Sequence, residues 1–280
     1  MLKLQYITFL WNDANGRPLT IYGRYFRQHP PDGKPKTIAS PGEKTKQSPL
    51  YFDRALEAGH KEIVLVEGVL DAVLLQAKGD TRVCAYVAAN CSGDQIETLR
   101  RRRITRVTLC GDPDAGGENG TNSNLLRLIE AGISVYIAPK LPDGLDPDEF
   151  LLKYGMEGWK THIDAAEHGF RWKARRLFES KDTSTDKGKA DVLQGAIAFC
   201  KAVKNHPDLD VFFWSAVRNS LGMEPEEFRA QLERLWESSP VAAAEFGGGS
   251  GGDGGDGDGG DRTGKVVKHP SFSPISPSEL

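Results

Sequence analysis

The sequence has few of the features that mark secreted, zinc-binding or membrane proteins. It contains four cysteines in 280 residues, and none of them forms a CxxC pair or stands at a zinc-ligand spacing from a histidine. We therefore expect no zinc site and reduced thiols. No apolar run reaches the length of a membrane span, and the first residues do not form a signal-peptide pattern. The sequence thus predicts a cytoplasmic protein with no membrane partner.

The overall charge gives little guidance to function. The formal net charge is −3, from 36 basic and 39 acidic residues, so the composition does not favour nucleic-acid binding. Carboxylates gathered at a metal site would cancel basic residues elsewhere, however. The local distribution of charge therefore matters more than its sum.

Residues 1–59 are predicted to form a short, basic α+β segment. Turn sequences such as Asn15-Gly16 and Pro41-Gly42 separate its strands. Basic side chains gather in it at Arg24, Arg27, Lys34, Lys36, Lys44 and Lys46. These side chains can belong to a solvated loop, or they can follow the backbone of a nucleic acid.

Residues 60–140 alternate between apolar strands and helices. Strands are expected at 63–66, 83–88, 106–110 and 134–138, and helices at 70–77, 92–102 and 122–131. Continuous apolar strands separated by helices predict an α/β fold, in which a parallel sheet is covered on both faces. Ligands of such sheets bind beyond the carboxyl ends of the strands.

Residues 141–238 are predicted to form an acidic segment and a helical subdomain. Asp146-Pro147-x-Glu149 has the form of a helix start. Further helices are expected at 159–179, 187–204, 210–221 and 225–236. Residues 239–280 are expected to be a disordered linker and tail, because 247–261 consist of Gly and Asp with a single Ser.

Two groups of carboxylates follow predicted strands. Glu67 ends the first strand with Asp71 one helical turn later, and Asp112 and Asp114 follow the strand 106–110. Parallel strands end at one edge of a sheet, so the four carboxylates are predicted to meet at one crevice. Mg²⁺ (or Mn²⁺) would offset their repulsion there and serve phosphoryl or nucleotidyl transfer. Glu67 could instead act as a general base, and each Asp taken singly could be a cap or turn residue.

The stretches 66–72 (Val-Glu-Gly-Val-Leu-Asp-Ala) and 112–116 (Asp-Pro-Asp-Ala-Gly) resemble the motifs of the Toprim domain. DnaG-type primases, topoisomerases, recombination-mediator proteins and some nucleases share that domain. Further stretches resemble the catalytic core of bacterial DnaG-type primases, at 16–17, 23–24, 34–36, 40–41 and 141–150. The resemblance implies a Toprim parallel sheet flanked by helices, with a short N-terminal mixed segment and a C-terminal helical subdomain.

The resemblance also implies roles for individual residues. Catalytic carboxylates are implied at Glu67, Asp112 and Asp114. Ligands of one or two metal ions, or of the incoming nucleotide, are implied at Glu67, Asp71, Asp112, Asp114, Asp146 and Asp148. Contacts to nucleic acid or to a triphosphate are implied at Arg24, Lys34 and Lys36. Asp146 keeps its alternative role as a helix cap.

The chain departs from the primase pattern in several respects. Pro113 stands where primases usually have Gly, and proline fixes φ and can shift Asp114. The zinc module of these primases has no counterpart, the front of the core is short, and the Gly/Asp tail stands in place of the helicase-binding domain. We therefore expect a protein that starts primers with a partner, such as a helicase or a separate zinc-domain chain, or that has lost initiation. A phage, plasmid or other mobile-element origin would fit this shortened form.

The expected function is primase-type nucleotidyl transfer, which makes RNA primers on single-stranded DNA from nucleoside triphosphates. One alternative is a Toprim nuclease, for which metal-dependent DNA degradation would argue. Another is a non-catalytic DNA-binding or adaptor subunit of a replication complex. Insensitivity of function to Glu67→Gln and Asp112→Asn would favour the adaptor.

Overall fold

The structure, a computed structural model, describes residues 6–25, 34–40, 45–112, 115–203 and 209–236. The described elements all belong to one unit, residues 1–246. A second unit, residues 247–280, lies wholly outside the described residues. The disordered linker and tail predicted at 239–280 also lie outside the described residues and stay a prediction.

The chain begins with a small antiparallel sheet. Its strands are β1 (Tyr6–Asn12), β2 (Pro18–Tyr25) and β3 (Thr37–Ala39), in that spatial order. Trp11 is fully buried, and its Nε1–H donates a hydrogen bond of 2.9 Å to the backbone carbonyl of Ser48. This bond ties the small sheet to the segment that leads into α1 (Phe52–Glu57), a helix that the sequence analysis did not predict.

The central sheet has five strands in the order β5-β4-β6-β7-β8. These are β4 (Glu62–Val66), β5 (Val83–Ala85), β6 (Arg106–Cys110), β7 (Ser134–Ile137) and β8 (Glu167–His168). The predicted parallel pairing is confirmed for β4 through β7, and β8 adds an antiparallel strand at the edge.

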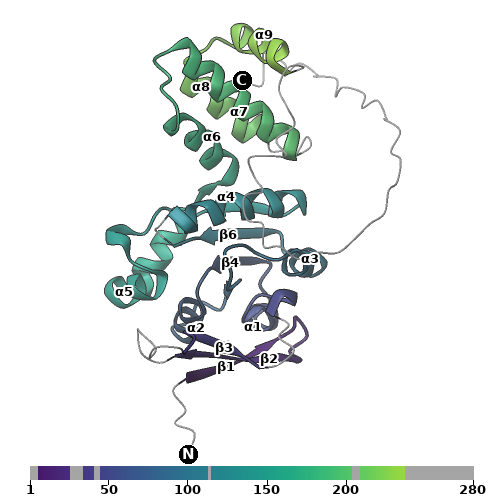
Figure 1. The fold of residues 1–280 in the computed structure, drawn as a ribbon, viewed down its shortest axis with the longest axis vertical. Helices are drawn as coiled ribbons and strands as arrows, with labels where there is room; N and C mark the ends of the chain where they lie inside the picture. The colour runs from purple at the N-terminus through teal and green to yellow at the C-terminus, as the bar shows by residue number, and fades with distance from the viewer. Residues whose placement is uncertain (1–5, 26–33, 41–44, 113–114, 204–208, 237–280) are drawn as a thin grey trace, which may run out of the picture. The chain divides into compact units, whose positions relative to one another are not determined.

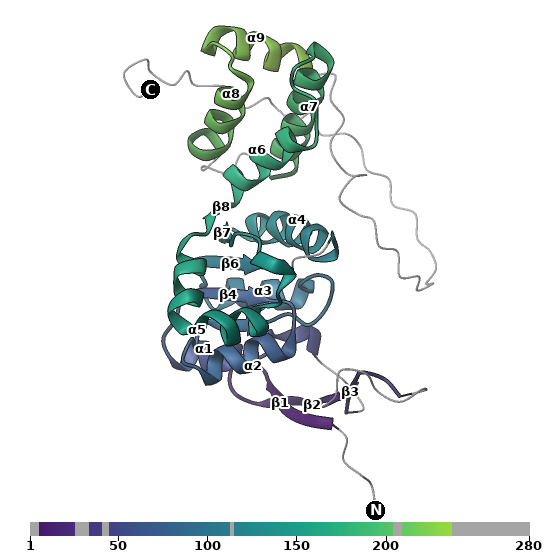
Figure 2. The same ribbon diagram turned by 90° about the vertical axis from the view of Figure 1, so that its left-hand side faces the viewer.

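Both faces of the central sheet are covered. Ile63 and Leu65 of β4 belong to one apolar core, whereas the alternate residues Val64 and Val66 belong to another. The first core includes α3 (Gly93–Arg101) and α4 (Ala115–Glu130). The second includes α2 (Val69–Ala77) and α5 (Pro147–Asp164). Figures 1 and 2 show these helices around the sheet, and burial on both faces explains the continuous apolar strands.

The C-terminal part of the unit is helical, as predicted. It consists of α6 (Gly169–Glu179), α7 (Asp186–Val203), a π-helix (Leu209–Trp214), α8 (Ser215–Leu221) and α9 (Pro225–Trp236). Three aromatic rings form its centre, with Phe199 5.7 Å from Phe170 and 4.9 Å from Phe213 between ring centroids. These residues join the core that contains α3 and α4.

The single helix predicted at 159–179 is wrong. The structure ends α5 at Asp164, inserts β8 and starts α6 at Gly169. The ring of His168 caps α6 by accepting a hydrogen bond of 3.3 Å from the backbone N–H of Phe170. A Cβ on Gly169 would stand 2.4 Å from Leu125 Cδ1, so the chain passes α4 too closely here for a larger residue.

Two boundaries in the central region also differ from the predictions. Helix α4 begins at Ala115 instead of residue 122, because its glycines serve close packing and do not interrupt the helix. Strand β5 ends at Ala85 instead of residue 88, and Val87 then adopts a φ of +52°. Among the described helices, none combines the length and the apolar character that crossing a membrane requires.

Candidate functional site

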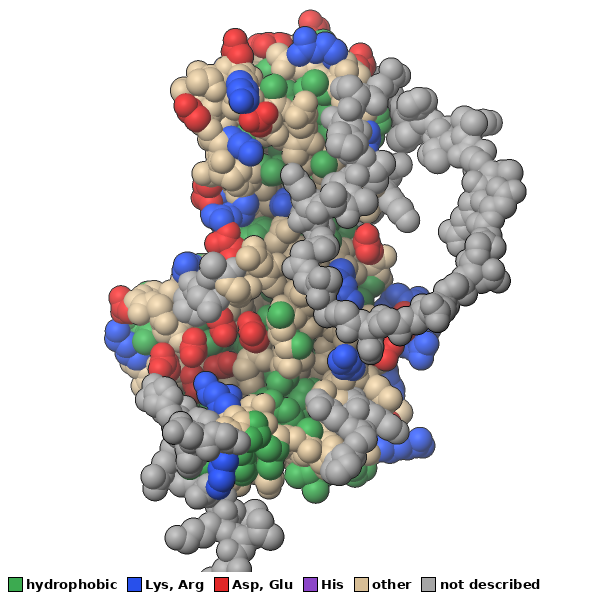
Figure 3. Space-filling model, viewed as in Figure 1, with side chains coloured by type: hydrophobic (Ala, Val, Ile, Leu, Met, Phe, Trp, Pro, Cys, Tyr) green, Lys and Arg blue, Asp and Glu red, His purple; other side chains and the backbone are tan. Residues whose placement is uncertain are grey.

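The carboxyl ends of β4 and β6 open into a cleft of about 430 Å³. Seven of the residues singled out in the sequence line it, namely Arg24, Lys36, Glu67, Asp71, Asp112, Asp146 and Asp148. In Figure 3, acidic side chains gather beside α5, and basic side chains lie next to them. The structure therefore brings most of the predicted set to one edge of the sheet; the roles of these residues remain predictions.

Glycine at position 68 places Asp71 against the end of β4. Glu67 follows the last residue of β4, Gly68 is the N-cap of α2, and Asp71 lies in the first turn of that helix. A Cβ on Gly68 would stand 2.1 Å from Asp71 Oδ2. The missing side chain thus leaves the space that the Asp71 carboxyl occupies, and only 6% of Asp71 is exposed.

Asp112 follows β6 and packs against the start of α4. A Cβ on Gly117 would stand 2.3 Å from the backbone oxygen of Asp112. The Thr121 hydroxyl donates a hydrogen bond of 2.8 Å to the carbonyl of Gly117 and so supports this turn. Pro113 and Asp114 lie outside the described residues, so the predicted effect of the proline on Asp114 stays a prediction.

The start of α5 docks on Asp71. Asp146 is the N-cap with Pro147 next, and Glu149 Oε2 accepts a hydrogen bond of 3.3 Å from the backbone N–H of Asp146. This arrangement confirms the predicted helix start. The backbone N–H of Asp148 donates a hydrogen bond of 3.1 Å to Asp71 Oδ1, so the acidic segment and the first Toprim-like motif are joined directly.

The local electrostatics oppose ionisation of Asp71. Burial is the first cause, the negative charge of Asp148 is the next, and those of Asp112 and Asp146 add to them. The hydrogen bond from Asp148 offsets this in part, and the pKa of Asp71 is raised from 3.8 to about 7. A cation in the cleft would reverse the effect, because it would favour the ionised carboxylate.

The remaining walls of the cleft come from the small sheet and from the loop after β5. Arg24 pairs with Thr37 across β2 and β3, and both residues line the cleft with Lys36. Lys34 is described but does not line it. The loop 87–89 also lines the cleft, and the backbone N–H of Val87 donates a hydrogen bond of 3.1 Å to the carbonyl of Glu67.

Sequence reasoning missed three parts of this wall. They are Tyr22, Thr37 and the loop 87–89. A signal for the loop was present, since β5 is parallel to β4 and its carboxyl end must lie at the same edge of the sheet.

The donor atoms of the cleft suit a hard divalent cation. Carboxylate oxygens are the ligands that Mg²⁺ and Mn²⁺ take, and five such side chains line the cleft, at Glu67, Asp71, Asp112, Asp146 and Asp148. Within the described ranges, no three or more His, Cys, Asp or Glu side chains stand close enough together to hold an ion. The chemistry of the donors therefore fits a metal ion. Coordination of one ion would require the side chains of these carboxylates to move closer to one another.

Comparisons with known proteins identify a family and relatives for part of the chain. Residues 64–151 match the family model described as Toprim-like. A DNA primase of Staphylococcus aureus is 31% identical over 169 residues, which are 59% of this chain and 27% of that primase. The chain thus matches about a quarter of the length of this curated relative.

Solved primase structures share the fold. A DNA primase domain from Pseudomonas aeruginosa has a TM-score of 0.66 at 23% identity and covers 82% of this chain and 72% of that one. A DnaG primase catalytic domain bound to single-stranded DNA has a TM-score of 0.68 at 23% identity, covering 78% and 69%. The chain therefore carries a Toprim-like domain and has the fold of the DnaG primase catalytic core.

Proposed function

We propose that this chain is a primase-like nucleotidyltransferase that makes RNA primers on single-stranded DNA with Mg²⁺ or Mn²⁺. One observation carries the proposal. Five carboxylates and two basic side chains line a single cleft at the carboxyl edge of the Toprim-like sheet. The names of the relatives support the reaction class, and the likeness to a catalytic domain that has single-stranded DNA bound supports the template.

The carboxylates and the basic residues have complementary tasks in this reaction. Glu67, Asp71 and Asp112 would hold the metal. Asp146 and Asp148, at the N-terminus of α5, would support it from the same cleft. The bound metal would supply charge neutralisation at the phosphate oxygens and would lower the pKa of the attacking hydroxyl. Asp114 would join this set, as the sequence predicts.

The basic wall would bind the triphosphate. Arg24 lies in β2 and Lys36 directly precedes β3, and both line the same cleft as the carboxylates. A guanidinium can hold phosphate oxygens with two parallel hydrogen bonds, and a lysine adds a point charge. Lys34 would extend this wall toward the template.

The reaction itself is a displacement at phosphorus. The 3′ oxygen of one nucleotide forms a bond to the α-phosphorus of the next, and the bond from that phosphorus to the bridging oxygen of the β-phosphate breaks. Pyrophosphate leaves, and the hydroxyl proton passes to the Glu67 carboxylate or to water. Positioning and charge stabilisation supply most of the catalysis in such transfers.

The finer expectations belong to the same proposal. They are a cytoplasmic site of action, primer initiation with a helicase or a separate zinc-domain chain, and nucleoside triphosphates as substrates. The fold and the cleft are compatible with each of them.

The proposal is tested by following labelled ribonucleotides on single-stranded DNA with Mg²⁺ or Mn²⁺. Wild type is compared with Asp112→Asn and with the matched control Asp164→Asn, which changes an exposed carboxylate outside the cleft. Short labelled products in wild type and in the control, but not in Asp112→Asn, are expected. Degraded template without products would show a nuclease instead, and product formation that Asp112→Asn leaves unchanged would contradict the assigned site.

A further inference from the structure

A second cavity lies on the other side of Asp112. It has a volume of about 180 Å³ and is lined by residues that follow β6, by the end of β7 and the segment after it, by the first turns of α4 and by one side of α6. Asp112 lines this cavity as well as the acidic cleft. Its other polar or aromatic lining side chains are Glu118, Thr121, Lys140, Trp172, Arg175 and Arg176. The volume is several times the ~30 Å³ share of one water, so a phosphate group fits.

The character of this second cavity is opposite to that of the acidic cleft. Three cations line it, at Lys140, Arg175 and Arg176, against the carboxylates of Asp112 and Glu118. The acidic cleft has five carboxylates against two cations. Asp112 thus lines both an acid-rich cleft and a cavity whose lining cations outnumber its lining carboxylates.

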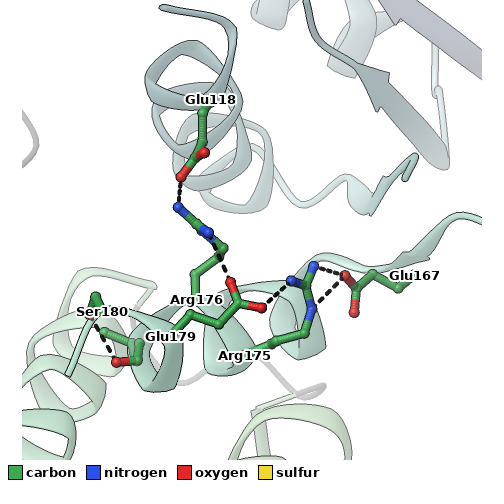
Figure 4. Close-up of polar contacts among 7 residues, drawn as sticks. Glu118, Glu167, Arg175, Arg176, Glu179 and Ser180 are labelled. Carbon is green, nitrogen blue, oxygen red and sulfur yellow. Dashed lines mark hydrogen bonds and ion pairs between the residues drawn. The ribbon is translucent and has the colours of Figure 1, made fainter. Parts of the chain in front are cut away.

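An ion-pair network fixes the two arginines. Arg175 binds Glu167 and Glu179, and Arg176 binds Glu179 and Glu118, as Figure 4 shows. The network joins the first turn of α4 to α6. It holds both guanidinium groups in place, and its three carboxylates outnumber the two arginines, so the network itself adds no net positive charge.

Lys140 lines the cavity but takes no part in the ion pairs of this network. It is exposed at the rim of the cavity, just beyond the end of β7. In the part of the chain that the structure describes, its ammonium group makes no ion pair or hydrogen bond. The cavity therefore offers one uncompensated cation and two positioned arginines that retain N–H donors.

The geometry points to this cavity as a site for a backbone phosphate of the nucleic-acid strand that carries the attacking 3′ hydroxyl. The inference rests on the proposed function, because nucleotidyl transfer places the attacking and leaving oxygens roughly in line. The attacking strand and the leaving pyrophosphate then lie on opposite sides of the α-phosphorus. Arg24 and Lys36 serve the triphosphate in the acidic cleft, so the strand falls on the side of Lys140.

Two variants that change the charge of the cavity in opposite directions test this site. Lys140→Ala removes the uncompensated cation, and Glu118→Gln removes a carboxylate that cancels Arg176. Lys78→Ala is the matched control, since Lys78 is an exposed lysine at the end of α2 that lines neither cavity. Binding of a fluorescent single-stranded oligonucleotide to the full chain is measured by anisotropy over a range of salt concentrations.

The expected shifts have opposite signs. Lys140→Ala should lower the salt slope by about 0.7, which is about fivefold in affinity at about 0.1 M salt. Glu118→Gln should raise the slope and tighten binding by a similar factor, and Lys78→Ala should match wild type. Binding of ATP alone should not change in Lys140→Ala.

Several results would overturn the inference. One is an oligonucleotide affinity of Lys140→Ala equal to that of wild type, and another is a change in affinity of Glu118→Gln in the same direction as that of Lys140→Ala. The others are no detectable oligonucleotide binding by wild type and a loss of ATP affinity in Lys140→Ala. The last result would assign the cavity to the triphosphate. Ribonucleotide incorporation is followed separately. If wild type makes no product but the two variants shift binding in opposite directions, the proposed function fails and the phosphate site stands.

Discussion

Replacing Asp71 by asparagine should change how the stability of the metal-free protein depends on pH. The amide would keep the shape of the side chain, and its oxygen could still accept the hydrogen bond from the Asp148 N–H. The substitution would remove the negative charge that burial and the neighbouring carboxylates oppose. It therefore isolates the electrostatic cost of the acidic cleft.

The magnitude follows from the pKa of Asp71. Because folding raises this pKa from 3.8 to about 7, folding favours the protonated carboxyl. The resulting stabilisation is complete below about pH 4 and is lost as the pH rises through about 7. The whole change corresponds to about 4 kcal/mol, at about 1.4 kcal/mol for each pKa unit. About 2 to 3 kcal/mol of it falls between pH 5 and pH 8.

The assay is urea denaturation in the presence of EDTA at several pH values. The free energy of unfolding of wild type should fall with rising pH relative to that of Asp71→Asn, whereas Asp164→Asn should follow wild type. Added Mg²⁺ should restore stability to wild type at pH 8 and do much less for Asp71→Asn. Parallel pH curves for wild type and Asp71→Asn would refute the reasoning.

Two further substitutions test the packing that positions the cleft. Trp159→Phe should cost about 1.5–3 kcal/mol in denaturation experiments, because the Trp159 Nε1–H donates a buried hydrogen bond of 2.9 Å to Asp80 Oδ2. Burial raises the pKa of Asp80, but Arg82 and Trp159 more than offset this and hold the pKa below 3.8. The stability cost of Trp159→Phe should therefore shrink as the pH falls below about 4. A stability cost that is independent of pH would contradict this. Gly117→Ala should cost about 1–3 kcal/mol and reduce metal-dependent incorporation, because its Cβ would stand 2.3 Å from the Asp112 carbonyl oxygen; wild-type stability and activity would show that this close packing is not needed.

The sequence predicted the central sheet well because its strands are buried on both faces. Four apolar runs, each followed by a helical pattern, allow few other arrangements, and β6 has the predicted bounds. The helix predicted from residue 92 also begins there, with Ser92 and Gln95 forming a capping box in which the backbone N–H of Gln95 donates a hydrogen bond of 3.0 Å to Ser92 Oγ. Local signals of this kind need no information about distant residues.

The helix and strand boundaries were predicted wrongly where contacts between residues distant in sequence decide the local structure. Nothing in the sequence around 165–169 shows that a short strand will pair with β7 before the next helix begins. The glycines of α4 read as interruptions of a helix. Their purpose becomes visible only when Gly117 meets Asp112 and Gly120 meets Ala89.

The candidate site was predictable as a set of carboxylates and unpredictable as a cavity. Strand ends and the Toprim resemblance located Glu67, Asp71 and Asp112, because parallel strands bring their carboxyl ends together. The basic cavity beyond Asp112 left no comparable signal. Arg175 and Arg176 are widely separated in sequence from β6 and β7, and they are placed by the packing of α6.

The most direct test of the central claim is a titration with Mn²⁺ followed by electron paramagnetic resonance. Wild type and Asp164→Asn should bind Mn²⁺, Asp112→Asn should bind it much more weakly, and ATP should change the spectrum of the bound ion in wild type. Equal Mn²⁺ binding by wild type and Asp112→Asn would contradict the assignment of the acidic cleft as the metal site.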